Sequence, residues 1–238
     1  LRKTTEKVYD LYCSIIAYAT YPSIRKDLDF PSAKHAIEYV FNYYRNIDHN
    51  DHNNVNAESI LDKLNYVIKE VATAYGDFAF LTLRPVPTGE YDKEGQEKIE
   101  YVIGKSFQRW ASQVQCAALW ELLEEDIALI KKNPDDFQMK WKEFCIDKMV
   151  NKPQNSKSIW KAQNDWGDKV REFLSSLRTV MLSDQNSPAH KRLIAEVQRA
   201  VDMPKEGREW LIKGWTEPQF TNDEVVFLKE TYERMRQD

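Results

Sequence analysis

The sequence predicts an all-α protein, an irregular bundle of eight or nine helices arranged as one domain or two lobes. Apolar residues recur every three or four positions along almost the whole chain, as on the buried face of an amphipathic helix. Helix-start signals precede several of these stretches, and only seven of the 238 residues are glycine. Scarce glycine disfavours β-barrels and nucleotide-binding α/β folds, which need it at tight turns.

The first part of the chain predicts three helices. Apolar residues at helical spacing define stretches at 8–19, 33–44 and 60–71. In the third stretch Asn56 is the expected N-cap and Gly76 the expected C-terminal stop.

Residues 85–93 break this pattern. Two prolines and a glycine stand within five residues there and favour a loop. We therefore predict a linker at 85–93 between an N-terminal helical lobe at 1–84 and a C-terminal helical lobe at 94–238. One continuous domain is the alternative.

Helical spacing continues through the second part of the chain. The longest stripe covers 96–130 and predicts one long helix, or two helices joined by a kink. Shorter stripes at 137–149, 159–181 and 193–201 each predict a further helix. The clearest local signal is the capping box at 221–224, Thr-Asn-Asp-Glu, which predicts the start of a last helix.

Composition limits the function classes. The formal net charge of −4 disfavours a dedicated nucleic-acid binder. Cys13, Cys116 and Cys145 are far apart in apolar helical stretches, which predicts buried free thiols in a reducing compartment and a cytoplasmic protein. We find no apolar run of about 18 residues and no signal peptide, so no membrane association is predicted. No Gly-rich phosphate loop is present, and no cofactor is predicted.

The most unusual stretch runs from Arg45 to His52 and holds two of the four histidines beside two carboxylates. A solvated loop is the first interpretation, because Asn and Asp favour turns. A divalent-metal site is the second, because imidazole and carboxylate groups bind zinc and manganese. Its ligands would be Asp48, His49, Asp51 and His52, together with further ligands from elsewhere in the chain.

The same stretch allows a third interpretation. Arg45 is followed by six residues and then His52, a spacing that resembles the Arg-x(4–6)-His motif of the all-helical HEPN-type ribonucleases. The resemblance covers eight residues and implies metal-independent RNA cleavage, with His52 in acid–base chemistry and Arg45 holding the scissile phosphate. The chain departs from the family in position, because only 44 residues precede a motif that the family carries late in its domain.

An acidic stretch offers another metal hypothesis. Glu121, Glu124 and Glu125 could share a helix face and hold magnesium, and Glu97 and Glu100 lie upstream. The spacing is faintly similar to the ExxE and ExxD pairs of all-α nucleotide pyrophosphatases. We favour a solvated face for these glutamates. Glu97 and Glu100 are expected on the same continuous helical stretch as the glutamates at 121–125, and the two groups would then lie too far apart to bind one ion.

Residues 131–172 are locally basic. Ten Lys and Arg stand against seven Asp and Glu, a net charge of +3, with three tryptophans interleaved. This combination could contact RNA through phosphate contacts and base stacking. Trp141 and Trp166 fall on apolar stripes and are predicted core residues, whereas Trp160 falls off the stripe.

The favoured hypothesis is a non-enzymatic helical protein-interaction module or a subunit of a larger intracellular assembly. No catalytic signature stands out, and several aromatic residues lie off or at the edges of their stripes, as at protein interfaces. The candidate contacts are Trp160, Trp210 and Trp215. The alternatives are the ribonuclease that uses Arg45 and His52, and a metal-dependent all-α hydrolase. The sequence predicts no substrate and no oligomeric state.

Overall fold

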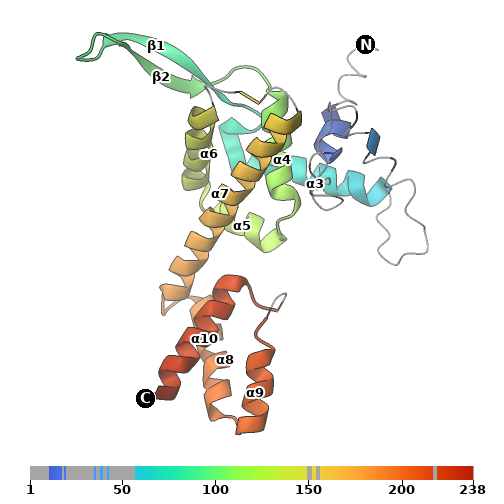
Figure 1. The fold of residues 1–238 in the computed structure, drawn as a ribbon, viewed down its shortest axis with the longest axis vertical. Helices are drawn as coiled ribbons and strands as arrows, with labels where there is room; N and C mark the ends of the chain where they lie inside the picture. The colour runs from blue at the N-terminus through green and yellow to red at the C-terminus, as the bar shows by residue number, and fades with distance from the viewer. Residues whose placement is uncertain are drawn as a thin grey trace. The chain divides into compact units, whose positions relative to one another are not determined.

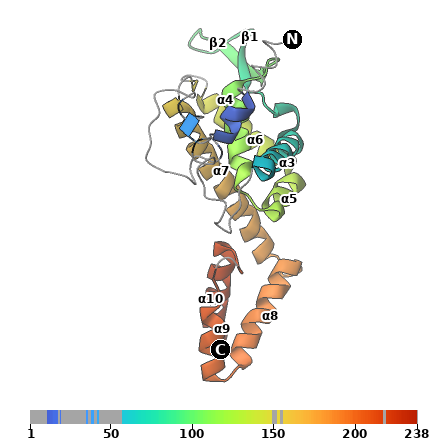
Figure 2. The ribbon, with the colours of Figure 1, turned by 90° about the vertical axis from the view of Figure 1, so that its right-hand side faces the viewer.

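The computed structural model (Figures 1 and 2) describes residues 11–17, 19, 35, 38, 39, 42, 57–148, 152, 153, 156–216 and 219–237. Across these residues the protein is mostly helical and has one two-stranded antiparallel sheet, which confirms the predicted multi-helix class. From residue 57 onward the elements are α3 (Ala57–Tyr75), the 3-10 helix η1 (Gly76–Phe78), β1 (Leu83–Tyr91), β2 (Glu97–Ile103), α4 (Arg109–Trp120), α5 (Glu124–Lys132), α6 (Pro134–Lys148), α7 (Ser156–Ser183), α8 (Pro188–Asp202), α9 (Lys205–Lys213) and α10 (Asn222–Gln237).

The chain forms two compact units, which we call unit 1 (Leu1–Val170) and unit 2 (Arg171–Asp238). The division falls inside α7 and not at residues 85–93. Residues 85–91 of the predicted linker form part of strand β1 and are not a loop. No helix in the described part of the chain is both long enough and apolar enough to cross a bilayer.

The prediction of one long helix, or two helices joined by a kink, over 96–130 is wrong for the first part of the stretch. Residues 97–103 form β2, and a loop at 104–108 follows. Two helices do form beyond it, α4 and α5, with a turn at 121–123 between them. Ile99 and Ile103 are four positions apart, a spacing that fits one turn of a helix and also two repeats of a strand. Tyr101 between them fits the alternation of period two, whereas Val102 does not, so the spacing alone does not separate the two structures.

Local signals at other helix ends are confirmed. At α10 the Thr221 hydroxyl accepts a bond from the Glu224 N–H (3.4 Å), and the Glu224 carboxylate accepts one from the Thr221 N–H (2.9 Å). This reciprocal pair is a capping box. The α3 helix ends at Tyr75, and Gly76 directly after it has a φ of +51°, the left-handed conformation that suits glycine after a helix C-terminus.

The core of unit 1 is aromatic. Trp141 and Trp166 are fully buried, as predicted, and their ring centroids lie 5.0 Å apart in an edge-to-face arrangement. Tyr75, Phe137 and Phe144 pack around them with centroid distances of 5.1–6.2 Å from the two indole rings. The indole N–H of Trp166 donates to the Tyr75 hydroxyl (2.7 Å), so the polar atoms of both rings are bonded in the core.

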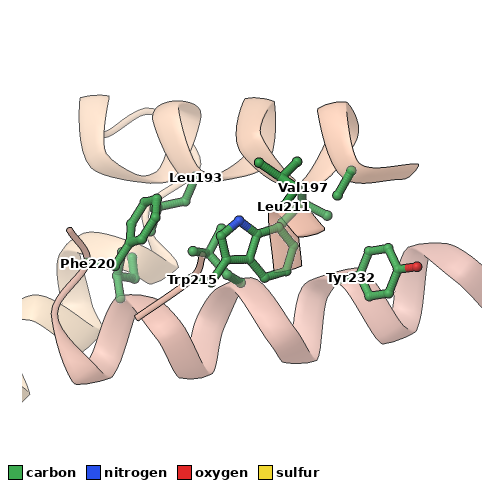
Figure 3. Close-up of a cluster of buried hydrophobic side chains, with 9 residues drawn as sticks. Leu193, Val197, Leu211, Trp215, Phe220 and Tyr232 are labelled. Atoms are coloured by element: carbon green, nitrogen blue, oxygen red, sulfur yellow. The ribbon is translucent and has the colours of Figure 1, made fainter. Parts of the chain in front are cut away.

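Unit 2 has a separate apolar core (Figure 3). Leu193 and Val197 of α8 lie on one side of Trp215, and Tyr232 of α10 packs edge-to-face on the indole with a centroid distance of 6.0 Å. Leu211 of α9 belongs to the same cluster. Unit 2 therefore buries its helices against one another through its own side chains.

Candidate functional site

The β1–β2 hairpin gathers several of the exposed apolar residues of unit 1 on one element. It projects beyond the helices of unit 1 in both views (Figures 1 and 2). Side chains alternate between the two faces of a strand, and residues paired across the ladder share a face. The pairs Pro85–Tyr101 and Pro87–Ile99 therefore lie on one face. The pairing is irregular between Pro87 and Tyr91. Beyond this point Tyr91 pairs with Glu97, which lies two residues from Ile99 on β2 and so shares its face. We call the apolar residues of this face the apolar face of the hairpin: Pro85, Pro87, Tyr91, Ile99 and Tyr101.

The apolar face is solvent-exposed along most of its length. Tyr91 is 64% exposed and Ile99 54%, and both prolines are exposed. The opposite face carries the exposed Arg84, Lys98 and Glu100 together with the half-buried Val86 and Val102. The charged side chains are thus gathered on one face, and the apolar residues of the other face are largely uncovered by the described residues.

The turn of the hairpin is set by Asp92 and Gly95. The Asp92 carboxylate accepts bonds from the backbone N–H groups of Glu94 (2.9 Å) and Gln96 (2.8 Å). Gly95 has a φ of +78°, which a side chain would disfavour. An aspartate followed three residues later by glycine between two extended runs is the signal that our sequence interpretation missed.

The base of the hairpin is fixed to the core. Leu83 and Thr82 are buried, and the Gly104 N–H donates to the Thr82 carbonyl oxygen (2.7 Å). A Cβ at Gly104 would lie 2.9 Å from that oxygen, so glycine permits the approach. The Trp141 indole donates to the Leu81 carbonyl (3.2 Å), which ties the segment before β1 to the aromatic core.

The segment that leads into the hairpin has an unusual backbone. Phe80 has a φ of +61°, a conformation that costs a non-glycine residue of order 1 kcal/mol or more. The buried Gln115 side chain holds it, since its Oε1 accepts from the Phe80 N–H (2.6 Å) and its Nε2 donates to the Phe78 carbonyl (3.0 Å). The Gln108 N–H donates to the Phe80 carbonyl (3.1 Å). These bonds set the direction in which the hairpin leaves the helices.

The tip of the hairpin is acidic. Residues 90–97 hold four carboxylates and one lysine, a net charge of −3. The nearby Lys98 ammonium pairs with Glu90 (3.0 Å), and both side chains are exposed. The apolar face therefore ends in a negatively charged tip.

The predicted catalytic and metal-binding residues lie outside the described residues. These are Arg45, Asp48, His49, Asp51 and His52. Their predicted roles stay predictions. Where the structure does describe the chain, no group of three or more His, Cys, Asp and Glu side chains is placed to hold a metal ion.

The three predicted interaction tryptophans differ in exposure. Trp210 on α9 is 77% exposed, and Trp160 on α7 is half-buried. Trp215 is 1% exposed, which corrects its prediction as a surface contact. It follows the last residues of α9 and turns into the core of unit 2, where its indole N–H donates to Glu196 (3.3 Å).

The acidic stretch at 121–125 is divided by the turn between α4 and α5. Glu124 and Glu125 stand in the first turn of α5, where carboxylates stabilise the positive end of the helix dipole. All three glutamates of the stretch are exposed. Glu97 and Glu100 lie on β2, so the continuous helix assumed for both pairs does not exist.

The basic stretch at 131–172 has two of its three tryptophans in the core and three of its lysines in ion pairs. Trp141 and Trp166 are buried and cannot stack on a base. Lys131 pairs with Glu70 (2.9 Å), Lys140 with Glu143 (3.3 Å) and Lys148 with Asp165 (2.9 Å). These pairs reduce the positive charge on which an RNA contact would depend.

Two cysteines of unit 1 are chemically quiet. Burial raises the pKa of Cys116 to about 12, and it raises that of Cys145 to about 12 against a smaller opposing effect of a backbone bond from Leu83. A thiol with so high a pKa carries almost no thiolate at neutral pH. Neither is a nucleophile, and both serve as core residues.

Comparison with known proteins gives no functional clue, since no family model, curated protein or solved structure matches this chain.

Proposed function

We propose that this chain is a protein-interaction module that docks a partner protein on the apolar face of its hairpin. The observation that carries the proposal is the exposure of Tyr91 and Ile99 on a hairpin whose base is fixed to the aromatic core. Exposed aromatic and aliphatic residues gathered on one element are typical of interaction sites. A fixed base supports the proposal, because it lowers the ordering cost of binding.

The charge of the tip indicates the chemistry of the partner. Four carboxylates against one lysine around the apolar face favour a partner with an apolar patch and a rim of Lys or Arg. The same charge disfavours nucleic acid at this site. The three free, buried cysteines support the expectation of a reducing, cytoplasmic setting.

A photo-crosslinking residue at position 91 tests the proposal. The matched control carries the same residue at position 84, on the opposite face of the same strand. We expect a discrete adduct with one protein from position 91 and none from position 84. Equal adducts from both positions would contradict the proposal.

An affinity titration with the captured partner then tests the energetics. We expect Tyr91→Ala to raise the dissociation constant about tenfold or more, as is typical of an aromatic contact that contributes strongly to an interface. Arg84→Ala is the control, and we expect it to change the dissociation constant less than about threefold. Unchanged affinity in Tyr91→Ala and in Ile99→Ala would exclude the apolar face as the docking site.

The ribonuclease and hydrolase alternatives depend on residues 45–52 or on the acidic stretch. No observation on the described residues favours either of them.

A further inference from the structure

The two outer edges of the hairpin differ in their ability to accept another strand. Residues of an antiparallel pair alternate between positions that bond across the ladder and positions whose N–H and C=O point outward. Thr82 and Gly104 bond across the ladder, so the pairs two residues further along do the same. The pairs Pro85–Tyr101 and Pro87–Ile99 therefore have outward-pointing backbone groups.

The outer edge of β1 is blocked. Both of its central outward positions are proline, which has no N–H to donate. Prolines at such positions are a common protection against edge-to-edge pairing. The outer edge of β2, in contrast, presents the N–H and C=O groups of Ile99 and Tyr101, and the sheet has no third strand among the described residues.

We propose that β2 pairs through this open edge with β2 of a second copy of the chain, antiparallel and about a two-fold axis at Ile99. The result is a four-stranded sheet whose middle strands are the two copies of β2. This surface is the backbone edge, distinct from the apolar face, and the inference does not depend on the proposed function.

Charge complementarity selects both the partner and the register. With Ile99 opposite its own copy, Lys98 lies opposite the second copy's Glu100, and Glu100 lies opposite the second copy's Lys98. Lys98, which also pairs with Glu90 of its own hairpin (3.0 Å), then stands between two carboxylates. Opposite charges directly across a strand pair stabilise it, and like charges destabilise it. Only registers that align outward-pointing residues are possible, and the two neighbouring ones place Glu100 against Glu100 or Lys98 against Lys98.

The length of the edge indicates a weak association. The paired segment at 97–101 is five residues long, about 17 Å at 3.4 Å per residue. Its interface lies at the small end of specific interfaces, below about 1,200 Å². We expect a monomer–dimer equilibrium that responds to protein concentration in the micromolar range or above.

Sedimentation velocity over a concentration series of the full chain tests this inference. We expect Ile99→Pro to abolish dimerisation. It removes one outward N–H and none of the ladder bonds within the hairpin, as the native Pro85 and Pro87 show. Ile99→Val keeps the N–H and is the matched control, with dimerisation close to that of the wild type. A thermal melt of each variant checks that unit 1 stays folded.

Charge reversal provides the sharper test. Glu100→Lys and Lys98→Glu each convert both cross-strand pairs to like charges, and we expect each to weaken dimerisation about tenfold. A mixture of the two variants restores both opposite-charge pairs, so we expect a heterodimer at wild-type strength. A wild type that stays monomeric, an Ile99→Pro variant that still dimerises, or a mixture no stronger than its components would overturn the inference.

Discussion

The aromatic core and the hairpin of unit 1 use similar side chains in opposite ways. Trp141 and Trp166 are completely buried, and each ring contacts others edge-to-face or at a tilt. Tyr91 and Ile99 on the hairpin are more than half exposed. A two-stranded ribbon has only marginal stability by itself, so this one is held by its base, where Leu83 is buried and Leu81 accepts the Trp141 indole bond.

The difference separates stability from recognition within one unit. Substitutions in the core should change the free energy of unfolding and leave the docking surface intact in the folded fraction. Substitutions on the apolar face should leave the free energy of unfolding unchanged and alter binding.

Trp141→Ala should give the largest loss. The indole is fully buried among aromatic rings and donates to the backbone of the segment that leads into the hairpin. Truncation of a buried aromatic residue destabilises by about 3–5 kcal/mol. Urea denaturation followed by far-UV circular dichroism measures the change. Trp210→Ala, at an exposed tryptophan, is the control and should stay within about 0.5 kcal/mol. A loss below about 1 kcal/mol for Trp141→Ala would contradict the assignment of this ring to the core.

Alkaline pH should destabilise the core through its two buried thiols. The pKa of Cys116 and of Cys145 is raised by burial from 9.0 to about 12, so above pH 9 the unfolded chain loses these protons before the folded one does. The unfolded state then binds fewer protons, and stability falls as pH rises through this window, by about 2 kcal/mol per thiol at 1.5 pH units above the unfolded pKa.

Denaturation midpoints measured from pH 8 to pH 10.5 check this dependence. The double variant Cys116→Ala/Cys145→Ala should show a shallower decline in stability, because it lacks the two buried thiols. Some decline should remain, because the tyrosine hydroxyl groups are still present. An identical decline in the wild type and the double variant would show that these thiols do not contribute.

The helical part of this architecture could be predicted from the sequence because its signals are local. The capping box at 221–224 and the glycine at position 76 each determine a helix end within four residues of chain. The buried state of Trp141 and Trp166 also followed from their positions on an apolar stripe. Trp215 did not, since it lies just beyond α9, and only packing in three dimensions shows where a residue outside a stripe points.

The hairpin could not be predicted from the same spacing argument. Ile99 and Ile103 satisfy the periods of helix and strand alike, and the turn depends on the Asp92 side chain and the positive φ of Gly95. The pairing of β1 with β2 then decides which apolar residues share a face. The candidate site is therefore a product of strand register, which the amphipathic helical pattern does not encode.

Tyr75→Phe and Tyr91→Phe make the same chemical change in the aromatic core and on the hairpin. Tyr75→Phe removes the acceptor of the Trp166 indole bond and leaves a buried N–H without its partner, which should cost about 1–2 kcal/mol. Tyr91→Phe removes an exposed hydroxyl and should change the free energy of unfolding by less than about 0.5 kcal/mol. Equal losses in the two variants, measured by urea denaturation, would show that the hairpin ring is buried in solution.

The smallest expected effect on stability is that of Tyr91→Ala, and it bears most directly on function. A ring that is 64% exposed contributes little to the free energy of unfolding, so the loss should be within about 0.5 kcal/mol. Thermal melts in dilute solution measure it below the concentration at which copies associate. A loss above about 2 kcal/mol would mean that part of the chain covers the apolar face, and a covered face could not dock a partner without first being released.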